Sequence, residues 1–423
     1  MANGHTVGVI DRRILLLLTS LALVGAACGS GGDDEAADAA PTPSTETTAA
    51  PASEATTTVV TPPETSPATV PATEPPATTL PEWAPVADGP YEVGVATIVL
   101  ADGERPLTVD VWFPLADGTS GLPLQQYTLI PGVYYESPNA FAATADLMAA
   151  DEAFPLIVYS HGSGGLRYIH SSYTEALASH GYLVAAPDHT GNTAVDRLAA
   201  SELPGDQIAY LRPNDVRRVI DAFTDPSDPA AGPWAAAVDA ERIAVTGHSF
   251  GGFTSIASVT GFSSENGSID ADPRVDAIIP IAPATGPALL PDEILGLVDV
   301  PMLVLVGTDD ATTPVDPNVT RLWDLNDNVP AYRVELVAGE HQTFTDLCAY
   351  TRTLPLLEGV PEIVVDTIES YAEEGCSEGD IDDQRAAELT NGYAIQFLDQ
   401  VFRGGPSIAS APPADVIFES RLP

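Results

Sequence analysis

The stretch RIAVTGHSFGG, Arg242–Gly252, decides how this sequence is interpreted. Its apolar run ends at Gly247-His248-Ser249-Phe250-Gly251, and the helical pattern FGGFTSIAS follows. This order predicts a buried strand, a sharp turn and a helix. Glycines two residues either side of the serine permit a strained turn that exposes the hydroxyl. We therefore predict that Ser249 is a nucleophile; the alternative is a tight turn with an unreactive serine.

The same alternation of strand and helix continues along the chain. YEVGVATIVL and PLTVDVWFP flank ADGER and predict a hairpin. Later runs, FPLIVYSHG, YLVAAPDH, RIAVTG, VDAIIPIAP, PMLVLVG and YRVELVAG, are typical of buried parallel strands. Helical patterns lie between them, including one that begins at Pro213 and an amphipathic one over residues 384–402. The fold class is therefore α/β: a mostly parallel sheet flanked by helices, with its active site at the carboxyl ends of the strands.

A serine nucleophile needs a base and an acid. Hydrolases with this turn place them in the chain order Ser, acid, His, and His341 in VAGEHQTF is the histidine that follows Ser249. Asp309 and Asp310 follow the strand PMLVLVG, and either could orient the imidazole. We predict that His341 is the base; the alternative is a surface histidine.

The remaining histidines near strand ends are given other roles. His161 and His189 are expected to position loops, and His248, beside the serine, is expected to be structural. The reaction also needs N–H donors for the oxyanion. The backbone N–H of Phe250 is one candidate, and the N–H of Ser163 in the glycine-rich loop HGSGG is the other. A plain glycine-rich turn is the alternative for that loop.

The composition excludes several classes of function. The chain has 423 residues and a net charge of −44, with 60 acidic and 16 basic residues, and every basic residue is arginine. So acidic a protein is not expected to bind nucleic acid. The histidines and cysteines lack metal-ligand spacing, so we expect no metal and no other cofactor.

The first 82 residues differ from the rest. Residues 1–28 combine Arg12 and Arg13, a short apolar run and small residues before Cys28, which is typical of a lipoprotein signal peptide. Residues 29–82 are rich in Pro, Thr, Ala, Ser and Glu and predict a disordered tether. We expect a folded domain over 83–405 and a C-terminal tail over 406–423. We also expect the protein to be exported and held at the outer face of the cell membrane by a lipid on Cys28, or otherwise to be secreted.

Two cysteines remain in the predicted domain. Cys348 and Cys376 are separated by a long segment and do not form a CxxC motif. In an exported protein a disulfide is the natural interpretation.

The sequence resembles bacterial α/β-hydrolases of the platelet-activating-factor acetylhydrolase and dienelactone hydrolase-like group. The likeness rests on FPLIVYSHGSGG, LASHGYLVAAPDHTGNT, VTGHSFGGFT and HQTFTDLC, and runs over some three quarters of the chain. The resemblance implies an α/β-hydrolase fold. It also implies Ser249 as nucleophile, His341 as base, and Phe250 and Ser163 as oxyanion donors. In this family the acid usually lies four residues before a proline, which selects Asp310, four residues before Pro314, over Asp309.

These observations predict a serine esterase that forms an acyl-enzyme and acts on a small ester or lipid at the cell surface. Short-acyl and phospholipid-like esters are the substrates that the resemblance implies. Two alternatives stay open: an acyltransferase that uses the same site, and a catalytically silent surface binding module. Nothing in the sequence specifies an oligomeric state.

Overall fold

The computed structural model describes residues 83–423, except 102–104, 131, 151, 358–359 and 409–410. The predicted signal peptide, Cys28 and the predicted tether lie outside the described residues.

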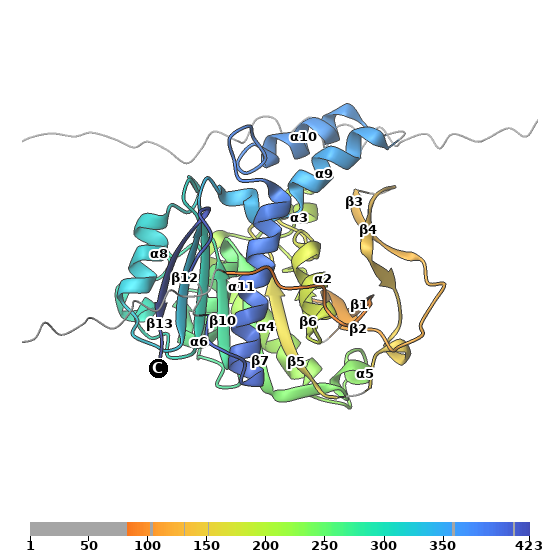
Figure 1. The fold of residues 1–423 in the computed structure, drawn as a ribbon, viewed down its shortest axis with the longest axis horizontal. Helices are drawn as coiled ribbons and strands as arrows, with labels where there is room; N and C mark the ends of the chain where they lie inside the picture. Colours follow the sequence, from red (N-terminus) through yellow and green to blue (C-terminus); the bar gives the residue numbers. More distant parts are fainter. Residues whose placement is uncertain (1–82, 102–104, 131, 151, 358–359, 409–410) are drawn as a thin grey trace, which may run out of the picture. The chain divides into compact units, whose positions relative to one another are not determined.

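A single large sheet organises the described residues (Figure 1). It has 11 strands in the order β13-β12-β11-β10-β7-β5-β6-β2-β1-β4-β3. Its centre is parallel, as the buried apolar runs predict. The parallel strands are β5 (Phe154–Ser160), β6 (Leu183–Pro187), β7 (Val238–His248), β10 (Ala277–Ile281), β11 (Met302–Gly307) and β12 (Ala331–Leu336).

Further strands extend the sheet on both sides, mostly in antiparallel pairs. The predicted hairpin is confirmed: β1 (Val93–Leu100) pairs with β2 (Leu107–Pro114), and β2 continues onto β6. Beyond β1 lie β4 (Val133–Ala142) and β3 (Leu124–Ile130). At the opposite edge, β13 (Val416–Arg421) pairs with β12.

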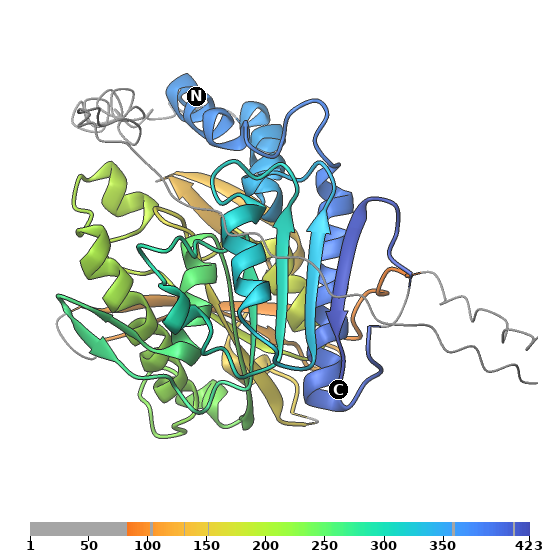
Figure 2. The same cartoon turned by 90° about the vertical axis from the view of Figure 1, so that its left-hand side faces the viewer.

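Helices cover both faces of the sheet (Figure 2). On one face pack α4 (Gly205–Phe223), α6 (Phe250–Thr260) and α8 (Val315–Asp324), and on the other α2 (Ser171–Ser179) and α11 (Asp383–Arg403). The side chains of β5 alternate between the two cores, with Leu156 and Val158 on one side and Ile157 and Tyr159 on the other. Burying each such side chain contributes about 1.5–3 kcal/mol.

The shorter elements connect these layers. They are α3 (Ala194–Leu198), α5 (Gly232–Ala235), α7 (Asp292–Leu295), α9 (Leu347–Thr353), α10 (Glu362–Ala372), the 3-10 turns η2 (Ala145–Leu147), η3 (His341–Phe344) and η4 (Leu354–Leu356), and the small hairpin β8 (Phe262–Ser264) and β9 (Gly267–Ile269).

Two predicted boundaries differ from the structure. The helix expected to begin at Pro213 begins at Gly205, because Ile208 and Ala209 bury on the same face as Val216 and outweigh the proline inside the helix. The predicted tail contains β13, so the sheet extends beyond the predicted domain end at residue 405. Pairing with β13 removes the exposed edge that β12 would otherwise present.

Candidate active site

Ser249 lies on a strained turn between β7 and α6. Its backbone has φ 58° and ψ −116°, a conformation that L-residues rarely adopt. Backbone hydrogen bonds with residues at and after the end of β10 hold it: Ser249 N–H donates to Ile281 O at 2.8 Å, and Ala284 N–H donates to Ser249 O at 3.1 Å. Such strain costs about 1–3 kcal/mol and persists only when neighbouring structure enforces it.

The glycines of the turn are required by close backbone contacts. A Cβ at Gly247 would lie 2.3 Å from Ser160 O, and a Cβ at Gly251 would lie 1.8 Å from the same oxygen. Neither position therefore accommodates a side chain. The G-x-S-x-G spacing thus reflects the passage of the turn across the end of β5.

The structure brings His341 against Asp310. His341 Nδ1 lies 2.9 Å from Asp310 Oδ2, and both side chains are buried. Asp309 is exposed and instead accepts a hydrogen bond from the Thr308 hydroxyl at 2.9 Å. Of the two adjacent aspartates, Asp310 is therefore the one that can orient the imidazole.

The carboxyl of Asp310 stays ionised in this setting. Burial raises its pKa, but hydrogen bonds from His341 and from the N–H and hydroxyl of Thr313 outweigh burial and lower the pKa below its ordinary value. The carboxylate can therefore accept a hydrogen bond from His341 Nδ1–H. With the proton held on Nδ1, Nε2 is left as the nitrogen that could accept another proton.

His341 lies beside the serine turn. Its ring centroid is 4.6 Å from that of His248, the residue before Ser249. His248 Nε2 and the carbonyl oxygen of His341 are 2.8 Å apart, so a His248 Nε2–H would bind the backbone of the loop that carries His341. Burial lowers the pKa of His248 well below its ordinary value, so the ring is neutral. A structural role, as the sequence suggests, fits this geometry.

The glycine-rich loop after β5 runs past the serine. The position of a Cβ on Gly162 would be 3.5 Å from Ser249 Cβ. Gly164 N–H donates to Asn192 O, and Ser163 Oγ accepts from Asn192 Nδ2 at 3.2 Å. Among the described residues, the Ser163 N–H donates no backbone hydrogen bond. The N–H of Phe250, at the start of α6, likewise has no intrahelical acceptor.

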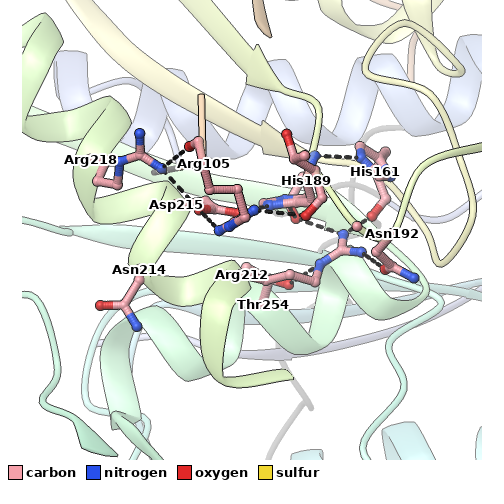
Figure 3. Close-up of polar contacts among 12 residues, drawn as sticks. Arg105, His161, His189, Asn192, Arg212, Asn214, Asp215, Arg218 and Thr254 are labelled. Atoms are coloured by element: carbon pink, nitrogen blue, oxygen red, sulfur yellow. Dashed lines mark hydrogen bonds and ion pairs between the residues drawn. The ribbon is translucent and has the colours of Figure 1, made fainter. Parts of the chain in front are cut away.

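A second Ser–His–Asp array lies where this loop leaves β5, and Figure 3 labels its histidine and aspartate, His189 and Asp215. Ser160 Oγ is 2.8 Å from His189 Nε2, and His189 Nδ1 is 2.9 Å from Asp215 Oδ2. All three residues are fully buried, with 0% exposure, and Asp215 also pairs with Arg105. Burial, reinforced by nearby arginines, lowers the pKa of His189 well below its ordinary value. Because all three side chains are fully buried, we interpret this array as structural.

His161 and His189 position loops, as the sequence predicts. His161 Nδ1 is 2.7 Å from Gly162 O, and His161 Nε2 accepts from His189 N–H at 3.1 Å. The sequence did not indicate Ser160, Asp215 or Arg212, the fully buried arginine of α4. These residues match no motif, and Ser160 is far from the other two in the chain. The one sequence signal is a pair of histidines that each end a strand.

Later segments of the chain hold the loop that carries His341. Gln342 N–H donates to Glu374 O at 2.7 Å, and Ile381 N–H donates to Ala338 O at 2.9 Å. On the strand side, Val337 N–H donates to Asp415 O at 2.9 Å. The loop that carries His341 is thus held by residues that follow it in sequence.

Cys348 and Cys376 form a disulfide across this region, with a Cα–Cα distance of 5.5 Å. The segment that it closes contains α9 and α10, which lie beside the ends of β3 and β4 (Figure 1). Tyr350 of α9 packs on Tyr135 of β4, with ring centroids 4.9 Å apart. The segment closed by the disulfide therefore contacts β4.

The loop after His341 is also tied to α2. Asp346 accepts hydrogen bonds from the Ser171 hydroxyl at 2.6 Å and from Ser172 N–H at 3.1 Å. A buried carboxylate at the start of a helix is stabilised by such donors.

In the part of the chain that the structure describes, no group of three or more His, Cys, Asp or Glu is arranged to hold a metal ion. No helix there is long and apolar enough to cross a membrane.

Comparisons with known proteins agree with this architecture. Residues 100–210 match the family model for platelet-activating factor acetylhydrolase, isoform II. The platelet-activating factor acetylhydrolase of Bos taurus is 28% identical over 151 residues, which are 30% of this chain and 34% of that protein. Its counterpart in Canis lupus familiaris is 25% identical over 228 residues, 40% of this chain and 50% of that protein. The matches thus span about a third to a half of these relatives.

A solved structure covers more of the chain. The ferulic acid esterase from Streptomyces cinnamoneus aligns with a TM-score of 0.58 and 25% identity, over 79% of this chain and 98% of that one. The protein therefore has an α/β-hydrolase fold and is similar in sequence to platelet-activating factor acetylhydrolases.

Proposed function

We propose that this protein is a serine hydrolase of carboxylic esters that acts through an acyl-enzyme on short-acyl or phospholipid-like esters. The observation that carries the proposal is the Asp310–His341 pair, 2.9 Å apart, beside the strained turn of Ser249. The similarity to platelet-activating factor acetylhydrolases and to a ferulic acid esterase supports ester hydrolysis as the reaction class.

The first half of the reaction forms the acyl-enzyme. Ser249 Oγ attacks the ester carbonyl carbon while its proton passes to His341 Nε2. The carbonyl oxygen becomes an oxyanion that the N–H groups of Ser163 and Phe250 stabilise. The C–O bond to the alcohol then breaks, and the alcohol leaves with the proton from His341.

The second half releases the acid. Water attacks the acyl carbon and gives a proton to His341, and the Ser249 ester bond then breaks as Ser249 recovers its proton from the imidazole. Asp310 keeps Nδ1 protonated and stabilises the imidazolium in both halves. An acceptor alcohol in place of water would give acyl transfer from the same intermediate.

The decisive test uses Ser249→Ala with a series of p-nitrophenyl esters of increasing acyl length. We expect the variant to lose turnover by on the order of 10⁴-fold or more, with little change in melting temperature. Ser263→Ala, an exposed serine in β8, is the matched control and should retain wild-type rates. Activity of Ser249→Ala near wild type would refute the mechanism.

Three measurements separate the alternatives. A burst of p-nitrophenol equal to the enzyme concentration indicates an acyl-enzyme. Products formed with added alcohol distinguish hydrolysis from acyl transfer. A silent binding module would give neither a burst nor labelling of Ser249 by a fluorophosphonate.

We also propose that the protein is exported and anchored to the outer face of the membrane by a lipid on Cys28. The support is the sequence alone: a short apolar run and small residues precede Cys28, and a Pro/Thr-rich segment follows. Metabolic labelling with a fatty acid should mark the wild type and not Cys28→Ala. Equal labelling of both would refute the anchor.

A further inference from the structure

Arg212 of α4 is a buried arginine with 0% exposure and an unusual set of partners (Figure 3). Its Nε donates to the Thr254 hydroxyl at 3.1 Å, and Nη1 donates to Asn192 Oδ1 at 2.6 Å. Its Nη2 donates to Ser160 Oγ and to the backbone carbonyl of His161. Each of these acceptors is neutral.

The buried guanidinium has no direct counter-ion. Among the described residues, no carboxylate forms an ion pair with Arg212. Asp215 on the same helix binds Arg105 and His189 instead, and is linked to Arg212 by hydrogen bonds through His189 and Ser160.

Stability alone does not account for this arginine. An unpaired buried charge is costly, and apolar replacements of buried ions are often neutral or stabilising. Burial lowers the pKa of Arg212 to about 9, while Asp215 acts in the opposite direction, so the side chain remains a cation at neutral pH. A charge retained at such a cost points to a role in the site above it.

The contacts of Arg212 join the two segments that carry the candidate oxyanion donors. On the α6 side, the guanidinium bonds to Thr254 and lies 5.0 Å from the centre of the Phe250 ring. On the loop side, it binds the end of β5 through Ser160 and His161.

A third contact extends to Ser163 itself. The amide side chain of Asn192 accepts from Arg212 and donates to Ser163 Oγ at 3.2 Å. The backbone carbonyl of Asn192 also accepts from Gly164 N–H at 3.1 Å. Arg212 therefore reaches the Ser163 loop both directly and through Asn192.

We propose that Arg212 is a positioning residue for the oxyanion hole, whose guanidinium fixes the N–H of Ser163 relative to the N–H of Phe250. This inference rests on the proposed ester hydrolysis and adds a residue that contacts neither substrate nor reacting atoms. The planar fork of arginine bridges three segments at fixed angles, which the single ammonium of lysine cannot reproduce.

The proposal has a kinetic signature. An oxyanion hole binds the transition state better than the substrate, so loosening it lowers kcat and leaves KM nearly unchanged. A displacement of about 1 Å at such a site costs on the order of 100-fold in rate. A purely structural arginine would lower the melting temperature and leave kcat per folded molecule unchanged.

The experiment compares Arg212→Lys, Arg212→Met and Asn192→Ala with the control Arg217→Gln, in which a partly exposed arginine of the same helix is replaced. Titration with a fluorophosphonate counts the competent sites, so misfolded molecules do not enter kcat. We expect Arg212→Lys and Asn192→Ala to lose about 10–100-fold in kcat, with KM within about threefold of wild type. Arg217→Gln should match wild type.

A trifluoromethyl ketone provides the second measurement, because its hemiketal oxygen occupies the position of the oxyanion. Its affinity should fall across the Arg212 variants by the same factor as kcat/KM. Should Arg212→Met fail to fold, the lysine and Asn192 variants still decide the matter. Wild-type kcat in both of those variants would overturn the inference, whereas a wild-type protein without Ser249-dependent ester hydrolysis would overturn the proposed function instead.

Discussion

Replacing Asp310 with asparagine should disable His341 while preserving the shape of the site. Asp310 Oδ1 accepts the Thr313 N–H at 2.6 Å, while Oδ2 faces His341 Nδ1 at 2.9 Å. Asparagine has one carbonyl oxygen, and its NH₂ cannot face the Thr313 N–H without placing two donors together. The NH₂ therefore faces His341 Nδ1. That nitrogen can accept a hydrogen bond from the NH₂ only if it carries no proton itself.

The size of the effect follows from this tautomer. The proton moves to His341 Nε2, the nitrogen that must accept the Ser249 proton, and the imidazolium loses its partner. The same substitution in a serine protease costs about 10⁴-fold in kcat. We expect a loss on the order of 10²–10⁴-fold, which corresponds to about 3–5 kcal/mol of transition-state stabilisation.

Asp309→Asn is the matched control, because the Asp309 side chain is exposed and accepts a hydrogen bond from the adjacent Thr308 hydroxyl, while its backbone bond to Gly339 O does not depend on the side chain. It should cost about tenfold or less. Initial rates with a p-nitrophenyl ester, normalised to sites titrated with a fluorophosphonate, measure both variants. If Asp309→Asn is the variant that loses most of its activity, the acid is Asp309 and the assignment is wrong by one residue. If both variants lose about tenfold or less, the acid lies elsewhere.

Three further predictions concern folding and stability. Gly251→Ala should destabilise the domain by at least about 3 kcal/mol, since its Cβ would overlap Ser160 O; urea unfolding with an unchanged midpoint would contradict this. Removing the disulfide in a Cys348→Ser/Cys376→Ser variant should cost about 3–4 kcal/mol for a span of 28 residues, and equal unfolding midpoints would exclude that contribution. The pKa of Asp310 lies below its ordinary value of 3.8, so its stabilisation is present above that pH and is lost as pH falls through the folded-state pKa. Melting curves from pH 7 to pH 3 should therefore show the gap between wild type and Asp310→Asn closing, and a gap that widens would reverse the sign.

The sequence was most informative where one local constraint determines a residue. The backbone oxygen of Ser160 leaves no room for a side chain at Gly247 or Gly251, so the serine turn can be recognised in the sequence as a motif. The β1–β2 hairpin and the parallel centre likewise follow from apolar runs bounded by turn residues.

The errors arose where a distant contact overrides a local signal. Pro213 is a typical helix start, yet burial of Ile208 extends α4 before it. β13 is short, and its pairing depends on the open edge of β12, which local pattern does not reveal. Arg212 is identified only in three dimensions, because its acceptors come from three separate segments of the chain.

The residues that hold the His341 loop are among the last to be synthesised, so the site is complete only late in translation. Ser249 and the Ser163 loop are synthesised well before the segments that bind that loop, which include Glu374 and Asp415. At 5–20 residues per second, roughly 10–30 s separate synthesis of the nucleophile from synthesis of the last of these supports. During that interval a nascent chain holds its nucleophile without a firmly placed base. On the proposed function, unfinished chains are therefore poor catalysts.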